Sequence, residues 1–201
     1  MSSLFDKLQS AAFRKGITAR TKESNEWFRD RIKDMGTINR NQLLKDERLQ
    51  KRQRFGVGNL YMFFYNPKHR KTLPYYDAFP LAIMVGPAPD GFYGLNLHYL
   101  PPTLRAKLFD ELLTIASNKR FDETTKFKLT YELLAGVQRF KLFKPCLKHY
   151  LTSQVQKPVA LVEASEWELS IFLPTESFKK AKNSRVWSDS RKAAKWVYLI
   201  R

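Results

Sequence analysis

Few residues of this chain have the types and spacing that chemistry requires. Cys146 and His149 lie three positions apart, which on a helix would bring a thiol close to an imidazole, the pairing used in nucleophilic catalysis. The sequence shows no third member for such a pair and no glycine loop that would serve as an oxyanion hole. We therefore interpret Cys146 as a buried structural cysteine.

A second candidate is the carboxylate pair Glu166 and Glu168, which share one face of an expected strand. A metal-dependent nuclease needs acidic side chains that converge with a lysine, but the next position on this face is a serine. The pair therefore fits a solvated strand face better than a metal centre. The histidines also lack metal-ligand spacing, so we expect no metal, no cofactor and no enzymatic activity. They are His69, His98 and His149; for His98 we expect a structural or surface role.

The elements that would position such residues change type along the chain. Residues 60–65, 79–85 and 91–99 predict strands, and residues 86–91 are typical of a hairpin loop. Gly94 predicts a bulge or bend in the third of these strands.

Helices are expected after these strands, over residues 104–115, 123–135 and 144–155, and the alternation of residues 166–171 predicts a returning strand. This order predicts an α+β fold, with a small, mainly antiparallel sheet or half-open barrel packed with helices.

Both flanks of this region are expected to be helical and basic. Three short helices are predicted first, over residues 3–16, 24–36 and 41–54, with Ser24 as the cap of the second. A short capped turn near Thr175 is expected after the core, followed by a final helix that begins at Ser184.

Positive charge is the strongest overall signal. The 201 residues include 36 Lys and Arg against 19 Asp and Glu, a formal charge of +17, while 43% of the residues are hydrophobic and exclude a disordered polycation. Basic and acidic residues number 14 and 7 in residues 1–58, 14 and 10 in residues 59–174, and 8 and 2 in residues 175–201. We therefore divide the chain into a basic helical N-terminal arm (1–58), an α+β core domain (59–174) and a basic C-terminal arm (175–201).

The sequence also suggests where the protein is made. Cys146 is the single cysteine, and no segment has the apolar length of a signal peptide core or of a membrane span. We expect synthesis in a reducing cytosol and no membrane partner.

Arms with so much positive charge repel themselves unless an anion offsets them, and nucleic acid is the commonest such anion. The residues predicted to contact DNA phosphates are Arg14, Lys15, Lys51, Arg52, Arg54, Lys179, Lys180, Lys182, Arg191 and Lys192. The aromatic residues predicted to anchor a partner protein are Trp27, Phe28, Trp187 and Trp196.

Five stretches of the chain resemble a virion protein family of T-even-like tailed bacteriophages, whose members are described as DNA end protectors or virion structural proteins. They are YNPKHRKTLPYYDAFPL (65–81), GLNLHYLPPTLRAKLFDEL (94–112), FKPCLKHYL (143–151), EWELSIFLPTESFKKA (166–181) and VWSDSR (186–191).

The resemblance implies a non-enzymatic virion protein, made in the host cytoplasm, that binds the ends of packaged double-stranded DNA at the head–tail junction beside other virion proteins. An alternative is a structural component of the phage tail, neck or baseplate whose arms bind neighbouring subunits. A third interpretation, a nuclease for head completion, would need catalysis by Glu166 or Glu168.

Overall fold

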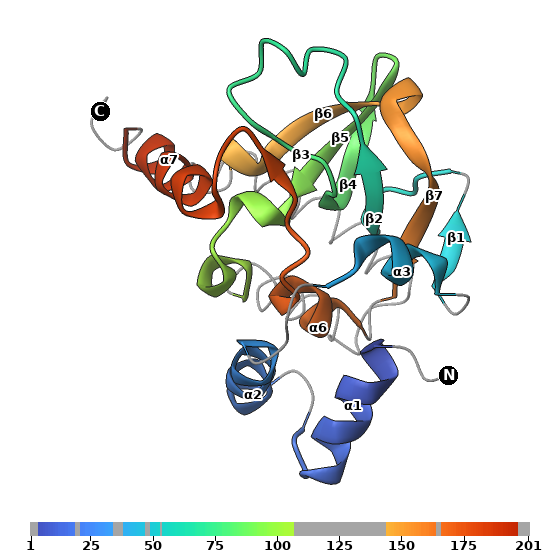
Figure 1. Ribbon diagram of the computed structural model, residues 1–201, viewed down its shortest axis with the longest axis vertical. Helices are drawn as coiled ribbons and strands as arrows, with labels where there is room; N and C mark the ends of the chain where they lie inside the picture. Colours follow the sequence, from blue (N-terminus) through green and yellow to red (C-terminus); the bar gives the residue numbers. More distant parts are fainter. Residues whose placement is uncertain are drawn as a thin grey trace, which may run out of the picture.

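The computed structural model describes residues 4–18, 21–33, 38–46, 49–52, 54–106, 144–163 and 166–196. They form a mainly antiparallel sheet packed with helices, so the α+β prediction is confirmed (Figure 1). The helices are α1 (Leu4–Arg14), α2 (Lys22–Lys33), α3 (Arg40–Lys45), α6 (Trp167–Phe172) and α7 (Asn183–Trp196), with 3-10 turns η1 (Leu97–Tyr99), η2 (Lys144–Cys146) and η3 (Thr152–Gln154). The strands are β1 (Gln50–Arg52), β2 (Leu60–Tyr65), β3 (Tyr76–Asp77), β4 (Leu81–Ala88), β5 (Gly91–Asn96), β6 (Leu147–Leu151), β7 (Val155–Val162) and β8 (Phe178–Lys179).

The larger sheet curls into a half-open barrel. Its strand order is β1-β7-β2-β4-β5-β6, while β3 and β8 form a separate pair. β6 and β7 follow each other through η3, yet they occupy opposite sides of the β2-β4-β5 meander. Rings on β2 and β6 nevertheless touch, with the centroids of Tyr65 and Tyr150 4.9 Å apart. Only a strongly curved sheet brings these two strands face to face.

Alternation along β2 places two different cores on the two faces of the curved sheet. Tyr61, Phe63 and Tyr65 point to the inside of the barrel, where the Phe63 ring meets Phe92 at 6.1 Å and Tyr150 at 5.4 Å. The edge-on geometry of both contacts is the arrangement that aromatic rings prefer. The inner core is therefore built mainly of aromatic rings.

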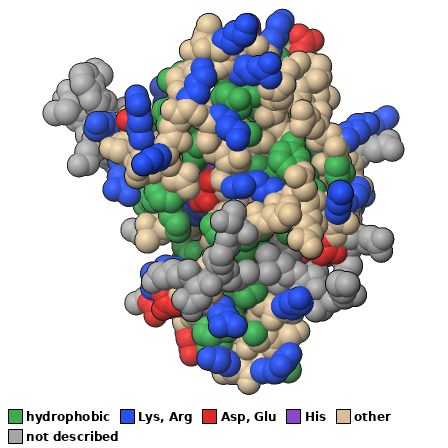
Figure 2. Space-filling model, viewed as in Figure 1, with side chains coloured by type: hydrophobic (Ala, Val, Ile, Leu, Met, Phe, Trp, Pro, Cys, Tyr) green, Lys and Arg blue, Asp and Glu red, His purple; other side chains and the backbone are tan. Residues whose placement is uncertain are grey.

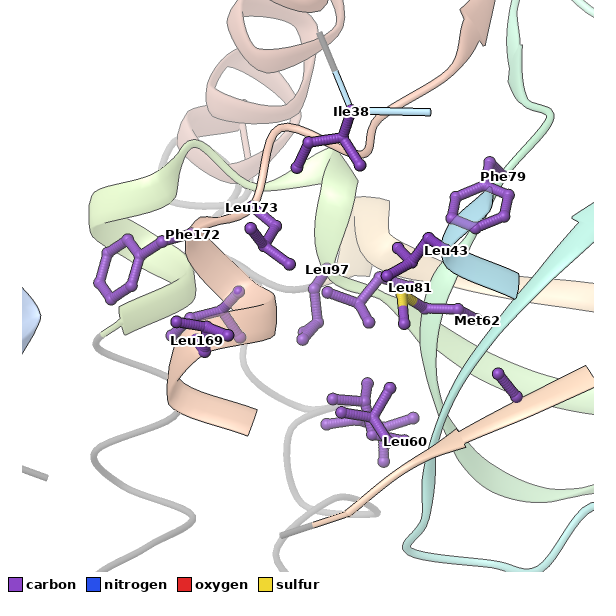
Figure 3. Close-up of a cluster of buried hydrophobic side chains, with 14 of the residues drawn as sticks. Ile38, Leu43, Leu60, Met62, Phe79, Leu81, Leu97, Leu169, Phe172 and Leu173 are labelled. Carbon is purple, nitrogen blue, oxygen red and sulfur yellow. The ribbon is translucent and has the colours of Figure 1, made fainter. Parts of the chain in front are cut away.

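The outer face of the sheet carries an aliphatic core that the helices cover. Figure 3 shows Leu60, Met62 and Leu81 of the sheet beside Leu43 of α3 and Leu169 of α6. All five side chains are at most 5% exposed. This core fixes α3 and α6 on one side of the barrel.

The N-terminal helices contribute to the same outer core. Leu8 and Ala12 of α1 and Phe28 of α2 belong to it. The Ser24 hydroxyl donates to the carboxylate of Glu168, which ties α2 to α6. Short helices with narrow apolar faces are marginal alone in water, so this packing accounts for their formation. The domain boundaries at residues 58 and 174 stay a prediction.

Two of the predicted N-terminal helices are present, and the third is much shorter. The residue that caps α2 is Thr21, whose Oγ1 accepts from the Ser24 amide at 3.0 Å. α3 has six residues, capped by Asn39, whose side chain accepts from the Gln42 amide at 3.1 Å. The prediction of a helix over residues 41–54 is therefore wrong beyond Lys45, because β1 pairs there with the distant strand β7.

Two further predictions of secondary structure are wrong. Residues 144–155 form η2, β6 and η3 in place of a helix, because β6 pairs with β5. Residues 167–172 form α6 in place of a strand. The alternation there carries no information about exposure, because Glu168 and Ser170 are buried together with their apolar neighbours.

Smaller differences concern the hairpin and the C-terminal segment. Gly94 pairs regularly, and the register shift lies between Met84 and Gly86 on the neighbouring strand. A side chain at Gly94 would lie 3.0 Å from the Tyr150 ring, so close packing explains this glycine. The turn expected near Thr175 leads instead into β8, whereas α7 forms as predicted.

Some predictions lie outside the described residues, namely the helix over 123–135 and most of the helix over 104–115, of which residues 104–106 are helical. Within the described ranges, no helix is both long and apolar enough to cross a membrane.

Candidate nucleic-acid interface

The ten basic residues predicted to contact DNA are all exposed, but they do not form one patch. They lie at the end of α1 (Arg14, Lys15), on or just after β1 (Lys51, Arg52, Arg54), around β8 (Lys179, Lys180, Lys182) and on α7 (Arg191, Lys192). α1, β1 and α7 lie on three different sides of the molecule (Figure 1). Figure 2 likewise shows Lys and Arg side chains over the whole visible face.

The basic residues of β1 belong to a strand at the edge of the sheet. Lys51 donates from Nζ to the carbonyl oxygen of Asp46 at 2.8 Å. Burial lowers the pKa of Lys51, although the charge of Asp46 opposes this shift. Lysine and arginine on an edge strand also discourage pairing with other chains, so these residues have a structural use beside any contact with DNA.

Lys180 holds a second basic segment against β8. Its Nζ donates to the carbonyl oxygens of Lys71 at 2.8 Å and Leu73 at 3.0 Å. Both acceptors belong to the loop of residues 66–75 between β2 and β3, which carries the exposed residues Lys68, Arg70 and Lys71. We call Lys68, Arg70 and Lys71 the loop patch. Figure 2 shows basic side chains gathered at this upper end of the molecule.

The base of this loop is fixed by one buried carboxylate. Asp77 accepts from the amides of Phe79 at 3.0 Å and Ser177 at 3.1 Å, from Asn96 Nδ2 at 3.1 Å, and pairs with His98 Nδ1 at 2.6 Å. Burial alone would raise the pKa of Asp77, but the charge and hydrogen bond of His98 and the other donors outweigh burial and hold it below its usual value. The carboxylate therefore joins β3 to β5, η1 and the segment before β8.

The Asp77→Asn variant is expected to unfold about 2 kcal/mol more easily at neutral pH, because the neutral amide loses the charged contact with His98. The folded-state pKa of Asp77 is lowered, so its contribution is present above about pH 4 and is lost as the pH falls through the folded value. Urea unfolding at neutral and acidic pH measures this difference. Asp90→Asn, at an exposed turn residue with φ of 58°, is the matched control. Equal stability of the two variants at neutral pH would contradict the assignment.

The distance from His98 Nε2 to Thr175 Oγ1 is 3.1 Å. An acid, a histidine and a hydroxyl therefore follow one another as in a catalytic triad, with Asp77, His98 and Thr175 in these places. All three residues are at most 3% exposed. A substrate has no access to the Thr175 hydroxyl, and the chain of contacts instead links η1 to the segment before β8. The structural role expected for His98 agrees with this geometry.

The two catalytic candidates of the sequence do not assemble. Cys146 is fully buried, and burial raises the pKa of its thiol to about 12. His149 is exposed on β6, with Nε2 2.9 Å from the carbonyl oxygen of Pro89. The prediction that Cys146 is a buried structural cysteine is therefore confirmed. Cys146 and His149 do not lie on one helix, because His149 belongs to β6.

The carboxylates Glu166 and Glu168 do not share a solvated strand face, so that interpretation is wrong. Glu166 directly precedes α6 and Glu168 lies in its first turn, where it is 5% exposed and accepts from Ser24. Glu166 is half-buried, and burial raises its pKa. Across the described part of the chain, no group of three or more His, Cys, Asp or Glu side chains is placed to hold a metal ion.

The aromatic residues predicted to bind a partner differ in how deeply they are buried. Phe28 is 5% exposed within the outer core, and the half-buried Trp27 packs edge-on against it at 5.1 Å. Trp187 donates from Nε1 to the carbonyl oxygen of His98 at 2.8 Å. Trp196 is the last residue of α7, and its side chain lies outside the described part. Their role in binding a partner stays a prediction.

A cavity of about 860 Å³ lies between the loop of residues 66–75 and β6. Tyrosine, lysine and histidine side chains make up much of its wall, and the carboxylates on it are Asp77 and Asp90. The aromatic and basic lining residues are Tyr65, Tyr75, Tyr76, Tyr99, Tyr150, Lys68, His69, Lys148 and His149. Mixed aromatic and basic walls of this kind suit nucleotides.

Comparison with known proteins found no matching curated protein and no matching solved structure. A family model, described as phage T4 terminal DNA protecting protein, matches residues 1–193. The match covers the N-terminal flank, the barrel and the C-terminal flank as far as residue 193, and it agrees with the resemblance seen in residues 65–191. The chain therefore belongs to the family of the phage T4 terminal DNA protecting protein.

Proposed function

We propose that this chain is a non-enzymatic phage virion protein that binds the ends of packaged double-stranded DNA and shields them from exonucleases. The family match over residues 1–193 is the observation that carries this proposal. Protection of an end requires only that the protein occupies the strand termini, so no chemical step is needed.

The charge of the chain supports DNA as the partner. Basic residues exceed acidic ones by 17, so pairing within the chain leaves many cations without a carboxylate. Some ion pairs that do form are weak, as for the exposed Arg185 and Asp189, 3.9 Å apart. Phosphates of the DNA backbone would offset this charge without any sequence preference.

Protection of linear DNA from a purified exonuclease tests the proposal. A short and a long blunt duplex are compared at equal concentrations of ends. An end-binding protein protects both at the same protein concentration, whereas a protein that coats DNA needs more for the longer duplex. Loss of DNA with the protein and Mg²⁺ alone would instead indicate a nuclease, and no protection of either duplex would refute the proposal.

A second candidate is a structural component of the tail, neck or baseplate that binds neighbouring subunits. Phe13, at the end of α1, favours it, because this large apolar side chain is 85% exposed. Self-association without DNA, measured by sedimentation and lost in Phe13→Ser, would support this function. A monomer that shows end protection would refute it.

A further inference from the structure

The cavity beside β6 has the size and the walls of a small-ligand site. Its volume of about 860 Å³ lies within the range of roughly 300–1,000 Å³ found for such sites. It opens between the loop that carries the loop patch and the inner face of the barrel. A single nucleotide can enter a space of this size, but a whole duplex cannot.

Lys148 is the residue of this cavity that favours an anionic ligand. It lies opposite Gly94 in the β5–β6 pairing, on the same face of β6 as the buried Tyr150. Its Nζ is 3.9 Å from the centroid of the Tyr99 ring. Among the residues that the structure describes, no carboxylate lies within 4.0 Å of this amine. A half-buried cation without a counter-ion is expected to attract an anion that enters beside it.

The two carboxylates that line the cavity do not neutralise Lys148. Asp77 is occupied by three donors and by the pairing with His98. Asp90 is exposed on the turn between β4 and β5. Burial lowers the pKa of Lys148. A phosphate would stabilise the charged amine.

Tyrosines supply the other half of a nucleotide site. Tyr75 and Tyr76 are half-buried on the loop side, and the rings of Tyr75 and Tyr99 lie 6.2 Å apart at an angle of 37°. Bases stack on such rings with little sequence preference, because every base has a flat π-face.

A site of this kind distinguishes an end from the interior of a duplex. An interior base must be flipped out of the stack on both sides before it can enter a cavity, whereas a terminal base is stacked on one side only. A phosphorylated terminal nucleotide also carries a phosphate monoester, whereas every phosphate inside a continuous strand is a diester. Both features favour an end over an interior site.

We propose that this cavity binds the terminal nucleotide of a DNA strand, with its terminal phosphate on Lys148 and its base against the tyrosines. The inference rests on the proposed binding of DNA ends and adds how an end is recognised. Lys68 and His69 line the same cavity and would contact the phosphates that follow.

The test is a double-mutant cycle in which the terminal phosphate of the DNA and the Lys148 side chain are removed separately and together. Dissociation constants are measured by fluorescence anisotropy for a blunt duplex with 5′-phosphates, with 3′-phosphates or with hydroxyls at all ends. The wild type is compared with Lys148→Met, which keeps the apolar stem over Tyr99, and with Lys7→Met on α1 at the opposite end of the molecule (Figure 1).

The wild type is expected to bind one of the phosphorylated ends about tenfold more tightly than hydroxyl ends. Lys148→Met should lose this preference, whereas Lys7→Met should keep it. The strand whose phosphate matters is then the one that enters the cavity. A preference that survives in Lys148→Met, or a wild type indifferent to both phosphates, would overturn the inference.

A second measurement does not depend on any variant. 2-Aminopurine at the terminal position of the duplex should change its emission when the wild type binds, and the same base at the centre should not. Equal responses would contradict entry of the terminal base. If the wild type binds covalently closed duplexes as tightly as open ones, the proposed function fails. If it binds open duplexes more tightly, but neither the terminal phosphate nor the 2-aminopurine gives the expected response, only the cavity inference fails.

Discussion

Replacing Arg105 by methionine is expected to lower the free energy of unfolding by about 3–5 kcal/mol, because it leaves a buried carboxylate without its partner. Arg105 is fully buried and pairs with Glu176. It also donates to the carbonyl oxygens of Leu100 at 2.8 Å, Ile171 at 3.1 Å and His98 at 3.4 Å. One side chain therefore joins η1, α6 and the segment before β8, and urea unfolding measures its contribution.

The pairing of Arg105 with Glu176 also predicts the effect of replacing both residues. Burial alone would raise the pKa of Glu176, but the charge and hydrogen bond of Arg105, together with the charge of His98 and a backbone hydrogen bond, outweigh burial and hold it below its usual value. The double variant Arg105→Met with Glu176→Met should therefore lose less than the sum of the single losses.

A matched control is Arg185→Met, which removes an exposed arginine that lies 3.9 Å from Asp189. Its loss should stay below about 1 kcal/mol. A loss of similar size for Arg105→Met and Arg185→Met would contradict the role given to the buried pair.

Binding to DNA is expected to weaken about 10³-fold between roughly 50 and 200 mM salt, the loss that follows when about six phosphates are neutralised. The phosphates release bound counterions when lysine and arginine replace them, and added salt opposes that release. Kd measured against salt concentration gives the number of neutralised phosphates from its slope. Affinity that barely changes with salt would contradict binding through phosphates.

The slope also locates the basic residues that bind. Changing the loop patch to glutamine at all three positions should reduce the slope by about 3, close to one unit for each phosphate that the variant no longer neutralises. The control changes Lys7, Arg29 and Arg31, three exposed residues of α1 and α2, in the same way. Equal effects of the two triple variants would mean that the loop patch has no special part in binding.

Local patterns predicted the elements whose contacts are also local. The strand over residues 60–65 and the hairpin that follows were recoverable from apolar runs and turn residues. The capped helices α1, α2 and α7 were recoverable in the same way. Failures occurred where a distant strand decides the conformation, as for β6, which pairs with β5 across a long stretch of chain, and for β1, which pairs with β7.

The candidate site was predicted less well than the fold. The net charge of the core is small when taken over the whole segment, and this average conceals the basic run Lys68-His69-Arg70-Lys71. That run was the available signal for the loop patch. Lys148 had no such signal, because its burial and its position over Tyr99 arise only when β6 joins the barrel.

Competition between open and closed duplexes shows whether this chain recognises DNA ends. The wild type is bound to a labelled blunt duplex and challenged with unlabelled duplex of the same sequence, either open or closed by hairpins at both ends. If the protein binds ends, the open duplex displaces the label at a much lower concentration than the closed one. Equal displacement by the two competitors would contradict binding to ends.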